Sequence, residues 1–167
     1  YKRQVLGRAL FVAPDGKTVI SVADDGSAEL WDPEKRTIRA AIRVSEDPLY
    51  GVSFTVRFSP DGKILATGAM KYTGSDRGRT VTAGILKLFD PSSGHEDALL
   101  LGQEGGIRAM AFLADGKILA TGSDTGSIVL WDIAGRTQKR KLTGHTDAVN
   151  RLAYSPDGKT LASGGQD

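Results

Sequence analysis

The sequence predicts an all-β fold built from repeated four-stranded antiparallel sheets. Three observations support this fold class: the triplet Asp-Gly-Lys occurs four times, a Trp-Asp or Phe-Asp pair follows three of the triplets, and short apolar runs alternate with turn residues throughout. Glycine accounts for 21 of the 167 residues, which favours many turns and leaves little room for long helices. Because the pattern recurs along the whole chain, it marks a structural unit rather than a single catalytic motif.

The four triplets define the period of the repeat. They begin at Asp15, Asp61, Asp115 and Asp157, which are 46, 54 and 42 residues apart. With 42 residues as the base period, the second unit contains 12 extra residues before its Phe-Asp pair, and four further residues precede that unit. The residue six positions after each Asp is always Ser or Thr, namely Ser21, Thr67, Thr121 and Ser163. The shared register predicts one architecture for all four units.

The third unit shows the expected strands most clearly. Its runs are IRAMAF at 107–112, KILATG at 117–122, SIVLWD at 127–132 and TQKRKL at 137–142. The Asp-Gly pair provides the tight turn between the first two runs, because Gly tolerates positive φ and Asp bonds to its own following backbone. The third run is apolar on both alternating faces, which predicts burial on both sides. The fourth is polar, as expected for an outer edge strand.

Sheets with two apolar faces must pack against similar sheets, and radial stacking of such sheets gives a β-propeller. The segments FSPDGKILATG, TGSIVLWD and LTGHTDAVNRLAYSPDGK resemble the WD-repeat (Trp-Asp) β-propeller family, in a style similar to its prokaryotic members. We therefore expect a β-propeller arc of about three and a half blades. The expected blades are residues 1–43, 44–101 with an inserted loop at 70–81, 102–143, and a truncated unit at 144–167. Residues 1–6 also fit the outer strand of a preceding blade.

Propeller rings usually contain about 4–8 blades, so we expect this chain to be a piece of a larger protein from which the rest of the propeller is missing. Closure of the arc by self-association is the alternative.

The resemblance implies a buried hydrogen-bonded tetrad of His, Ser or Thr, Asp and Trp in each blade. The matching residues are His145, Ser163 and Asp167 in the fourth unit, Thr121 and Trp131 in the third, and Ser21, Asp25 and Trp31 in the first. The third unit has Gln103 at the His position and Thr125 at the Asp position. The second unit retains only Thr67, with Phe89 in place of Trp. His95 follows Phe89 too closely to be a tetrad member.

Composition and motifs exclude several classes of function. The 22 basic and 20 acidic residues give a formal net charge of +2, which argues against a dedicated nucleic-acid binder. The absence of Cys excludes disulfides and thiolate sites, and no apolar run is long enough to span a bilayer. The Gly-Lys-Thr triplets at 16–18 and 158–160 lack the earlier Gly of a phosphate loop. We therefore expect no catalytic residue, no metal or cofactor, and no nucleic-acid or membrane partner.

The two insertions suggest where partners bind. Residues 70–81 and the extra residues within 44–50 connect strands at the same end of the sheets, near the mouth of a propeller channel. Loops on a rigid scaffold often carry function, and Tyr and Arg are favoured interface residues. The predicted partner-binding residues are Tyr50, Met70, Lys71, Tyr72, Arg77 and Arg79. A tolerated surface insertion without a partner fits the sequence equally well.

The leading functional hypothesis is a non-catalytic scaffold that binds proteins or peptides on the propeller face. The resemblance to prokaryotic members implies an alternative, a sensor or regulatory propeller attached to a kinase- or protease-like domain. An active site in the channel would require inward-facing acidic residues, His or metal ligands in several blades, and the sequence repeats no such set.

Overall fold

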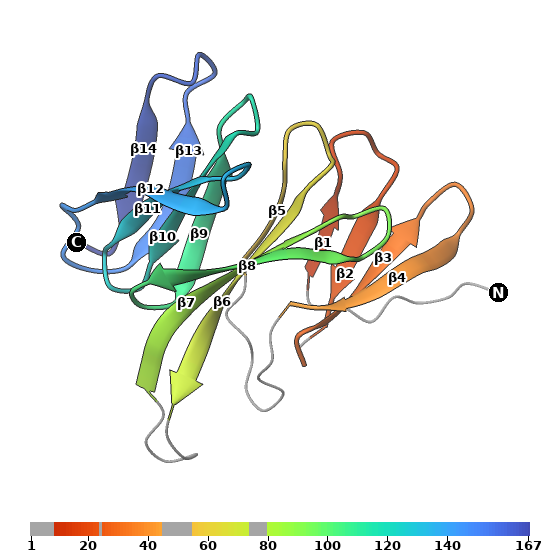
Figure 1. Ribbon diagram of the computed structural model, residues 1–167, viewed down its shortest axis with the longest axis horizontal. Helices are drawn as coiled ribbons and strands as arrows, with labels where there is room; N and C mark the ends of the chain where they lie inside the picture. Colours follow the sequence, from red (N-terminus) through yellow and green to blue (C-terminus); the bar gives the residue numbers. More distant parts are fainter. Residues whose placement is uncertain (1–8, 24, 45–54, 74–79) are drawn as a thin grey trace.

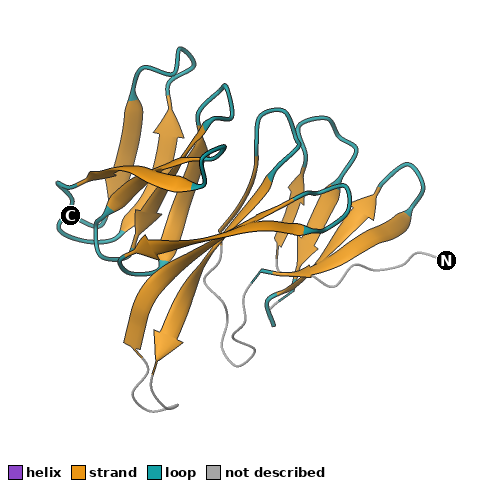
Figure 2. Ribbon diagram, in the orientation of Figure 1, coloured by secondary structure: helices purple, strands orange, loops and turns teal. Residues whose placement is uncertain are grey.

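The computed structural model describes residues 9–23, 25–44, 55–73 and 80–167. These residues form four antiparallel sheets arranged side by side in an arc (Figures 1 and 2). Every sheet is a meander in which the strands pair in chain order. The predicted all-β propeller arc of about three and a half blades is confirmed. Within the described ranges, no helix is long and apolar enough to cross a membrane.

The sheets differ in their number of strands. The first contains β1 (Ala9–Val12), β2 (Val19–Val22), β3 (Ser27–Asp32) and β4 (Thr37–Arg43). The second contains β5 (Thr55–Phe58), β6 (Leu65–Thr73), β7 (Thr80–Phe89) and β8 (Glu96–Gln103). The third contains β9 (Ile107–Phe112), β10 (Ile118–Ser123), β11 (Ile128–Asp132) and β12 (Thr137–Leu142). The fourth contains β13 (Val149–Tyr154) and β14 (Leu161–Gly165).

The Asp-Gly pairs form the turn between the first two strands of each sheet. Each Asp carboxylate accepts a hydrogen bond from the backbone N–H of the Lys two residues later, at 2.9–3.1 Å. The four glycines have φ between 69° and 72°, a left-handed conformation that side chains with a Cβ rarely adopt. Local sequence chemistry therefore sets the start of every sheet.

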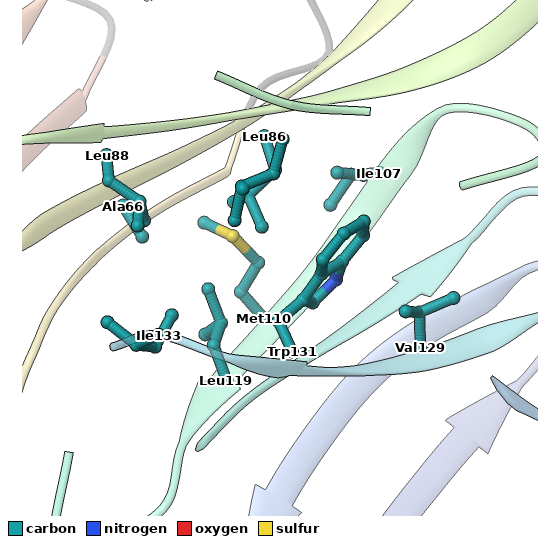
Figure 3. Packing of buried hydrophobic residues seen from close by; sticks show 10 residues of the cluster. Ala66, Leu86, Leu88, Ile107, Met110, Leu119, Val129, Trp131 and Ile133 are labelled. Atoms are coloured by element: carbon teal, nitrogen blue, oxygen red, sulfur yellow. The ribbon is translucent and has the colours of Figure 1, made fainter. Parts of the chain in front are cut away.

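The hydrophobic core lies between the sheets. One cluster joins the first and second sheets through Ile20, Val22, Ala28, Leu30, Ile42, Val44, Val56, Leu65 and Phe89. A second cluster joins the second and third sheets and includes Ala66, Leu86, Met110, Leu119, Val129 and Trp131 (Figure 3). Leu65 and Ala66 are neighbours on β6 and enter different clusters, because successive side chains of a strand point to opposite faces. The second sheet is thus buried on both faces, as the apolar pattern predicted.

The inserted segment of the second unit extends a hairpin. The strands β6 and β7 contain 9 and 10 residues, whereas their counterparts β10 and β11 contain 6 and 5. Strand pairing continues through Lys71 with Ala83 to Thr73 with Thr80. The prediction of a loop over 70–81 is therefore wrong at both of its ends, where β-branched and aromatic residues favour strand. Residues 74–79 lie outside the described residues.

Candidate functional site

The third sheet contains a buried hydrogen-bond network at the predicted tetrad positions. The indole N–H of Trp131 donates to Thr121 Oγ1 at 2.8 Å, and the Thr121 hydroxyl donates to Gln103 Oε1. The Gln103 amide nitrogen donates to the carbonyl oxygens of Thr121 and Ser127, at 3.3 and 3.4 Å. The side-chain amide of Gln103 thus both accepts and donates, as a neutral His does. All three residues are at most 2% exposed, so the network belongs to the core.

In the third sheet, two neighbouring residues make the hydrogen bonds expected near the Asp position of the tetrad. Thr125 occupies the predicted position and donates its hydroxyl to the carbonyl of Glu104 at 3.2 Å. The preceding residue, Asp124, accepts the N–H of Gly106 at 2.8 Å and donates its own N–H to the carbonyl of Gly106 at 3.0 Å. These bonds attach the β10–β11 turn to the segment that precedes β9. Asp124 was not predicted from the sequence, because it lies one residue before the position in exact register.

The fourth sheet brings together the three residues predicted for its tetrad. His145 Nδ1 lies 2.6 Å from Asp167 Oδ1, and its Nε2 lies 2.8 Å from Ser163 Oγ. The N–H of Thr146 donates to the other carboxylate oxygen of Asp167 at 2.8 Å. The hydrogen bond from His145, followed by that from Thr146, lowers the pKa of Asp167 from 3.8 to about 2.

This His145–Ser163–Asp167 cluster has the connectivity of a Ser-His-Asp catalytic triad. Each member, however, lies 42 residues after the corresponding position of the third sheet, where Gln103 and Thr121 form the buried network. The repeated fold therefore accounts for the arrangement without a catalytic role. Within the described ranges, no group of three or more His, Asp or Glu side chains could hold a metal ion.

In the first sheet, Trp31 and Asp25 form hydrogen bonds with residues of their own strand and turn. The indole N–H of Trp31 donates to Glu29 Oε2 at 3.2 Å, two residues earlier on β3. The carboxylate of Asp25 accepts the N–H and the hydroxyl of Ser27, at 2.9 and 2.6 Å. Ser21 is buried, with 4% exposure, while Trp31 is half-buried.

The second sheet has a polar group at the same place with no partner. Thr67 is 1% exposed, and its hydroxyl makes no hydrogen bond to any described residue. Phe89 pairs with Leu65 just as Trp131 pairs with Leu119, so it fills the Trp position without an N–H to donate. Leaving a buried hydroxyl unsatisfied costs about 1–3 kcal/mol.

The predicted partner-binding patch lies mostly beyond what the structure describes. Four of its six side chains are outside the described part: Tyr50, Tyr72, Arg77 and Arg79. Met70 is only 5% exposed and packs so closely on Gly106 that a side chain at that glycine would overlap it. The prediction that Met70 contacts a partner is therefore wrong, since Met70 is a core residue between sheets. Lys71 is exposed, and His95 lies in the exposed turn between β7 and β8.

The first strands of the sheets line a cavity of about 340 Å³. Strand β9 packs between β5 and β13, and the cavity spans all three together with Phe11 of β1. Three of its lining side chains are arginines, Arg57 of β5, Arg108 of β9 and Arg151 of β13. Among the described residues that line the cavity, none is Asp or Glu. All three side chains are exposed at their ends, and partial burial of the Arg57 guanidinium, followed by the nearby charge of Arg151, lowers its pKa.

These arginines were not predicted from the sequence as site residues. Each is in the first strand of its unit, but they lie four, seven and six residues before the Asp of the following Asp-Gly turn. Register shifts occur in the pairing of β9 with β10 and of β13 with β14, next to Arg108 and Arg151. An Arg in three successive first strands was the only signal in the sequence.

Comparison with known proteins identifies the family. The model for the WD domain, G-beta repeat (WD40) matches residues 5–32, 93–132 and 136–167, which together are well over half of the chain. The chain belongs to the WD40 family. The resemblance seen in the sequence is thus confirmed. The unmatched middle of the chain holds most of the second unit, in which the insertion occurs and Phe89 replaces Trp.

Curated WD40 relatives are much longer than this chain. It is 29% identical over 146 residues to nuclear distribution protein PAC1 of Arthroderma otae, and 36% identical over 127 residues to pre-mRNA-processing factor 19 homolog 2 of Arabidopsis thaliana. These matches include 76% and 75% of this chain but only 29% and 21% of the relatives. The crystal structure of the RRP9 WD40 repeats has a TM-score of 0.71 at 23% identity, and the match covers 91% of this chain and 43% of that one. That likeness shows the fold.

Proposed function

We propose that this WD40 chain is a non-catalytic interaction scaffold that binds proteins or peptides on the propeller face. One observation carries the proposal: the polar cluster most like a catalytic site, His145–Ser163–Asp167, occupies the same repeat positions as the buried network of the third sheet. The polar chemistry repeated along the chain therefore serves the fold. Rigid sheets with exposed turns provide a surface for partners.

The relatives support a scaffold function in which different proteins of the family bind different partners. Their names describe nuclear distribution in one protein and pre-mRNA processing in another. A common fold with such different roles is expected when function depends on surface residues rather than on a shared reaction. The extended β6–β7 hairpin and its exposed Lys71 distinguish this chain from a minimal repeat and are candidates for such a surface.

Two measurements test the proposal. The tagged protein is purified from its own cells, and cross-linked lysines are mapped by mass spectrometry. We expect a reproducible protein partner cross-linked to the loops at the ends of the sheets. In parallel, the protein is treated with a fluorophosphonate probe, with Ser163→Ala as the control. Labelling that depends on Ser163, together with ester hydrolysis, would show that the cluster is catalytic and would refute the proposal.

A further inference from the structure

The outer strand of the second sheet differs in charge from the outer strands of the first and third sheets. Strands β4, β8 and β12 are each last in their sheets, so one edge of each pairs with no strand in the described part of the chain. Cations occupy several exposed positions of two of these strands, namely Arg39 and Arg43 in β4, and Lys139, Arg140 and Lys141 in β12. Such cations discourage pairing of an edge with another strand. Strand β8 contains no Lys or Arg.

Two exposed leucines stand in β8 where the other outer strands have cations. In the strand pairings, Leu99 matches Lys141 of β12, and Leu101 matches Arg43 of β4. Leu99 and Leu101 are 49% and 61% exposed. They lie two residues apart, so they point to the same side of the strand, opposite to the buried Leu100 between them. The second sheet packs against the first on one face and the third on the other, so this exposure is a property of its outer rim.

The length and regularity of β8 suit the addition of another strand. A long, exposed and apolar edge is a site at which a further strand pairs. Strand β8 has 8 residues, against 7 in β4 and 6 in β12. A register shift beside the aromatic position is common to all three sheets and does not distinguish β8. Pairing with β7 is regular over Ala98–Leu100, and the second register shift of β8 lies beyond this stretch.

Acidic side chains flank the two leucines. Glu96 and Asp97 precede them, and Glu104 follows β8; all three are exposed. Glu96 pairs with Lys87 at 3.1 Å and Glu104 with Lys141 at 2.9 Å. Asp97 forms no ion pair with any described residue. The edge therefore complements a strand that is apolar in its middle and basic at its ends.

We propose that the free edge of β8 binds an extended segment of a partner protein, in which apolar side chains alternate and Lys or Arg residues lie at the ends. The inference rests on the proposed scaffold function and adds to it a contact at the outer rim. The backbone of the segment pairs with the edge, and its alternating side chains cover Leu99 and Leu101. Its terminal cations lie near Asp97 and Glu104.

The outer strands of a second copy fit this edge less well than such a segment does. The apolar side of β4 is already used, because Ile42 and Ala40 pack in the cluster between the first and second sheets. Strand β12 is polar along most of its length, and five of its six residues are exposed. Neither strand offers free alternating apolar side chains to the two leucines.

The test is fluorescence anisotropy of short labelled peptides with the whole chain. One peptide alternates Val and Thr and has Lys at both ends, a second has Glu at the ends, and a third is the first with N-methyl groups at consecutive central residues. N-methylation blocks backbone pairing and retains the side chains. We expect the first peptide to bind at least about tenfold more tightly than the other two, because both backbone pairing and charge contribute to strand addition.

Variants of β8 locate the site. Leu101→Arg, which introduces the residue type of Arg43 in β4, should weaken binding of the first peptide about tenfold or more, since it removes apolar burial and repels the Lys residues. Asp97→Asn should weaken it about threefold at low salt, as expected for an exposed ion pair. The matched control is Val12→Arg, because Val12 is also 61% exposed but lies on β1. It should leave binding unchanged.

Other outcomes overturn the inference. Equal binding of the N-methylated peptide would show apolar contact without strand pairing, and normal binding by Leu101→Arg would place the site elsewhere. Leu101→Thr removes apolar surface without adding charge and should bind at an intermediate level, which guards against a folding defect in Leu101→Arg. Self-association that Leu101→Arg abolishes, with no peptide bound, would assign the edge to a second copy. A cross-linked protein partner that binds Leu101→Arg normally would leave the scaffold function intact and refute this site alone.

Discussion

The second and third sheets have the same strand order and the same pairing, yet they differ at one buried hydroxyl, which is hydrogen-bonded in the third sheet and unpaired in the second. In the third sheet, Thr121 bonds to Trp131 and Gln103. In the second, Thr67 occupies the equivalent place beside Phe89 and has no partner among the described residues. Both aromatic residues nevertheless pack toward the preceding sheet, since each belongs to the cluster on that side.

The comparison shows that packing between sheets, rather than the polar network, specifies a blade. Burial of one large apolar side chain stabilises the fold by about 1.5–3 kcal/mol, and one hydrogen bond contributes about 0.5–1.5 kcal/mol net. Phe89 retains the burial of a large side chain, while the unpaired hydroxyl of Thr67 costs about 1–3 kcal/mol. The second sheet therefore forms without the network, and the family can replace individual tetrad residues.

The largest expected effect on stability comes from removing the aromatic side chain at the position that Phe89 occupies in the second sheet and Trp131 in the third. Trp131→Ala should lower the free energy of unfolding by about 3–5 kcal/mol, because it creates a cavity and leaves Thr121 with one partner fewer. Urea denaturation followed by circular dichroism measures the change. Trp31→Ala, at a half-buried indole, is the matched control and should cost clearly less. Equal costs would mean that burial between sheets does not set the contribution of this position.

Removing the amide from the network should have the next largest effect. Gln103→Ala should destabilise the protein by about 1–3 kcal/mol, since it leaves polar groups around a fully buried site unsatisfied. Gln138→Ala, at an exposed position on β12, should stay within about 0.5 kcal/mol of wild type. The same denaturation series measures both variants, and a neutral Gln103→Ala would show that the network is dispensable in the third sheet as well.

The sharpest contrast replaces each hydroxyl by a methyl group of similar shape. Thr67→Val should raise the free energy of unfolding by about 1 kcal/mol, because it removes an unsatisfied buried donor. Thr121→Val should lower it by about 1 kcal/mol or more, since Trp131 and Gln103 then lose their shared partner. Thermal melts of the two variants on the same day would reveal the opposite signs. Changes of the same sign would contradict the assignment of Thr67 as unpaired.

The smallest effect concerns pH and the fourth sheet. Because the folded-state pKa of Asp167 is depressed from 3.8 to about 2, its stabilising contribution is present above pH 3.8 and is lost as the pH falls toward 2. Wild type should therefore melt at a higher temperature than Asp167→Asn near neutral pH, and the difference should disappear at about pH 2. A difference that is independent of pH would show that the carboxylate charge is not responsible.

Local chemistry determined much of this structure. The Asp-Gly pairs fixed the first turn of each sheet, because the glycine conformation and the Asp hydrogen bond involve only neighbouring residues. The constant distance from each Asp to its Ser or Thr then set the register of the second strand. For the same reason, repeat spacing alone placed Gln103 at the His position of the third sheet and grouped His145, Ser163 and Asp167 in the fourth.

Only the tertiary structure decided which side chains face a neighbouring sheet. Met70 lies in an insertion and looked available to a partner, but the close approach of Gly106 places it in the core. Thr67 has no indole N–H beside it because Phe89, 22 residues later, stands at the position that Trp131 occupies in the third sheet. The three arginines line one cavity because the first strands of separate sheets pack side by side. Sequence spacing describes contacts within a repeat, whereas contacts between repeats depend on how the sheets pack.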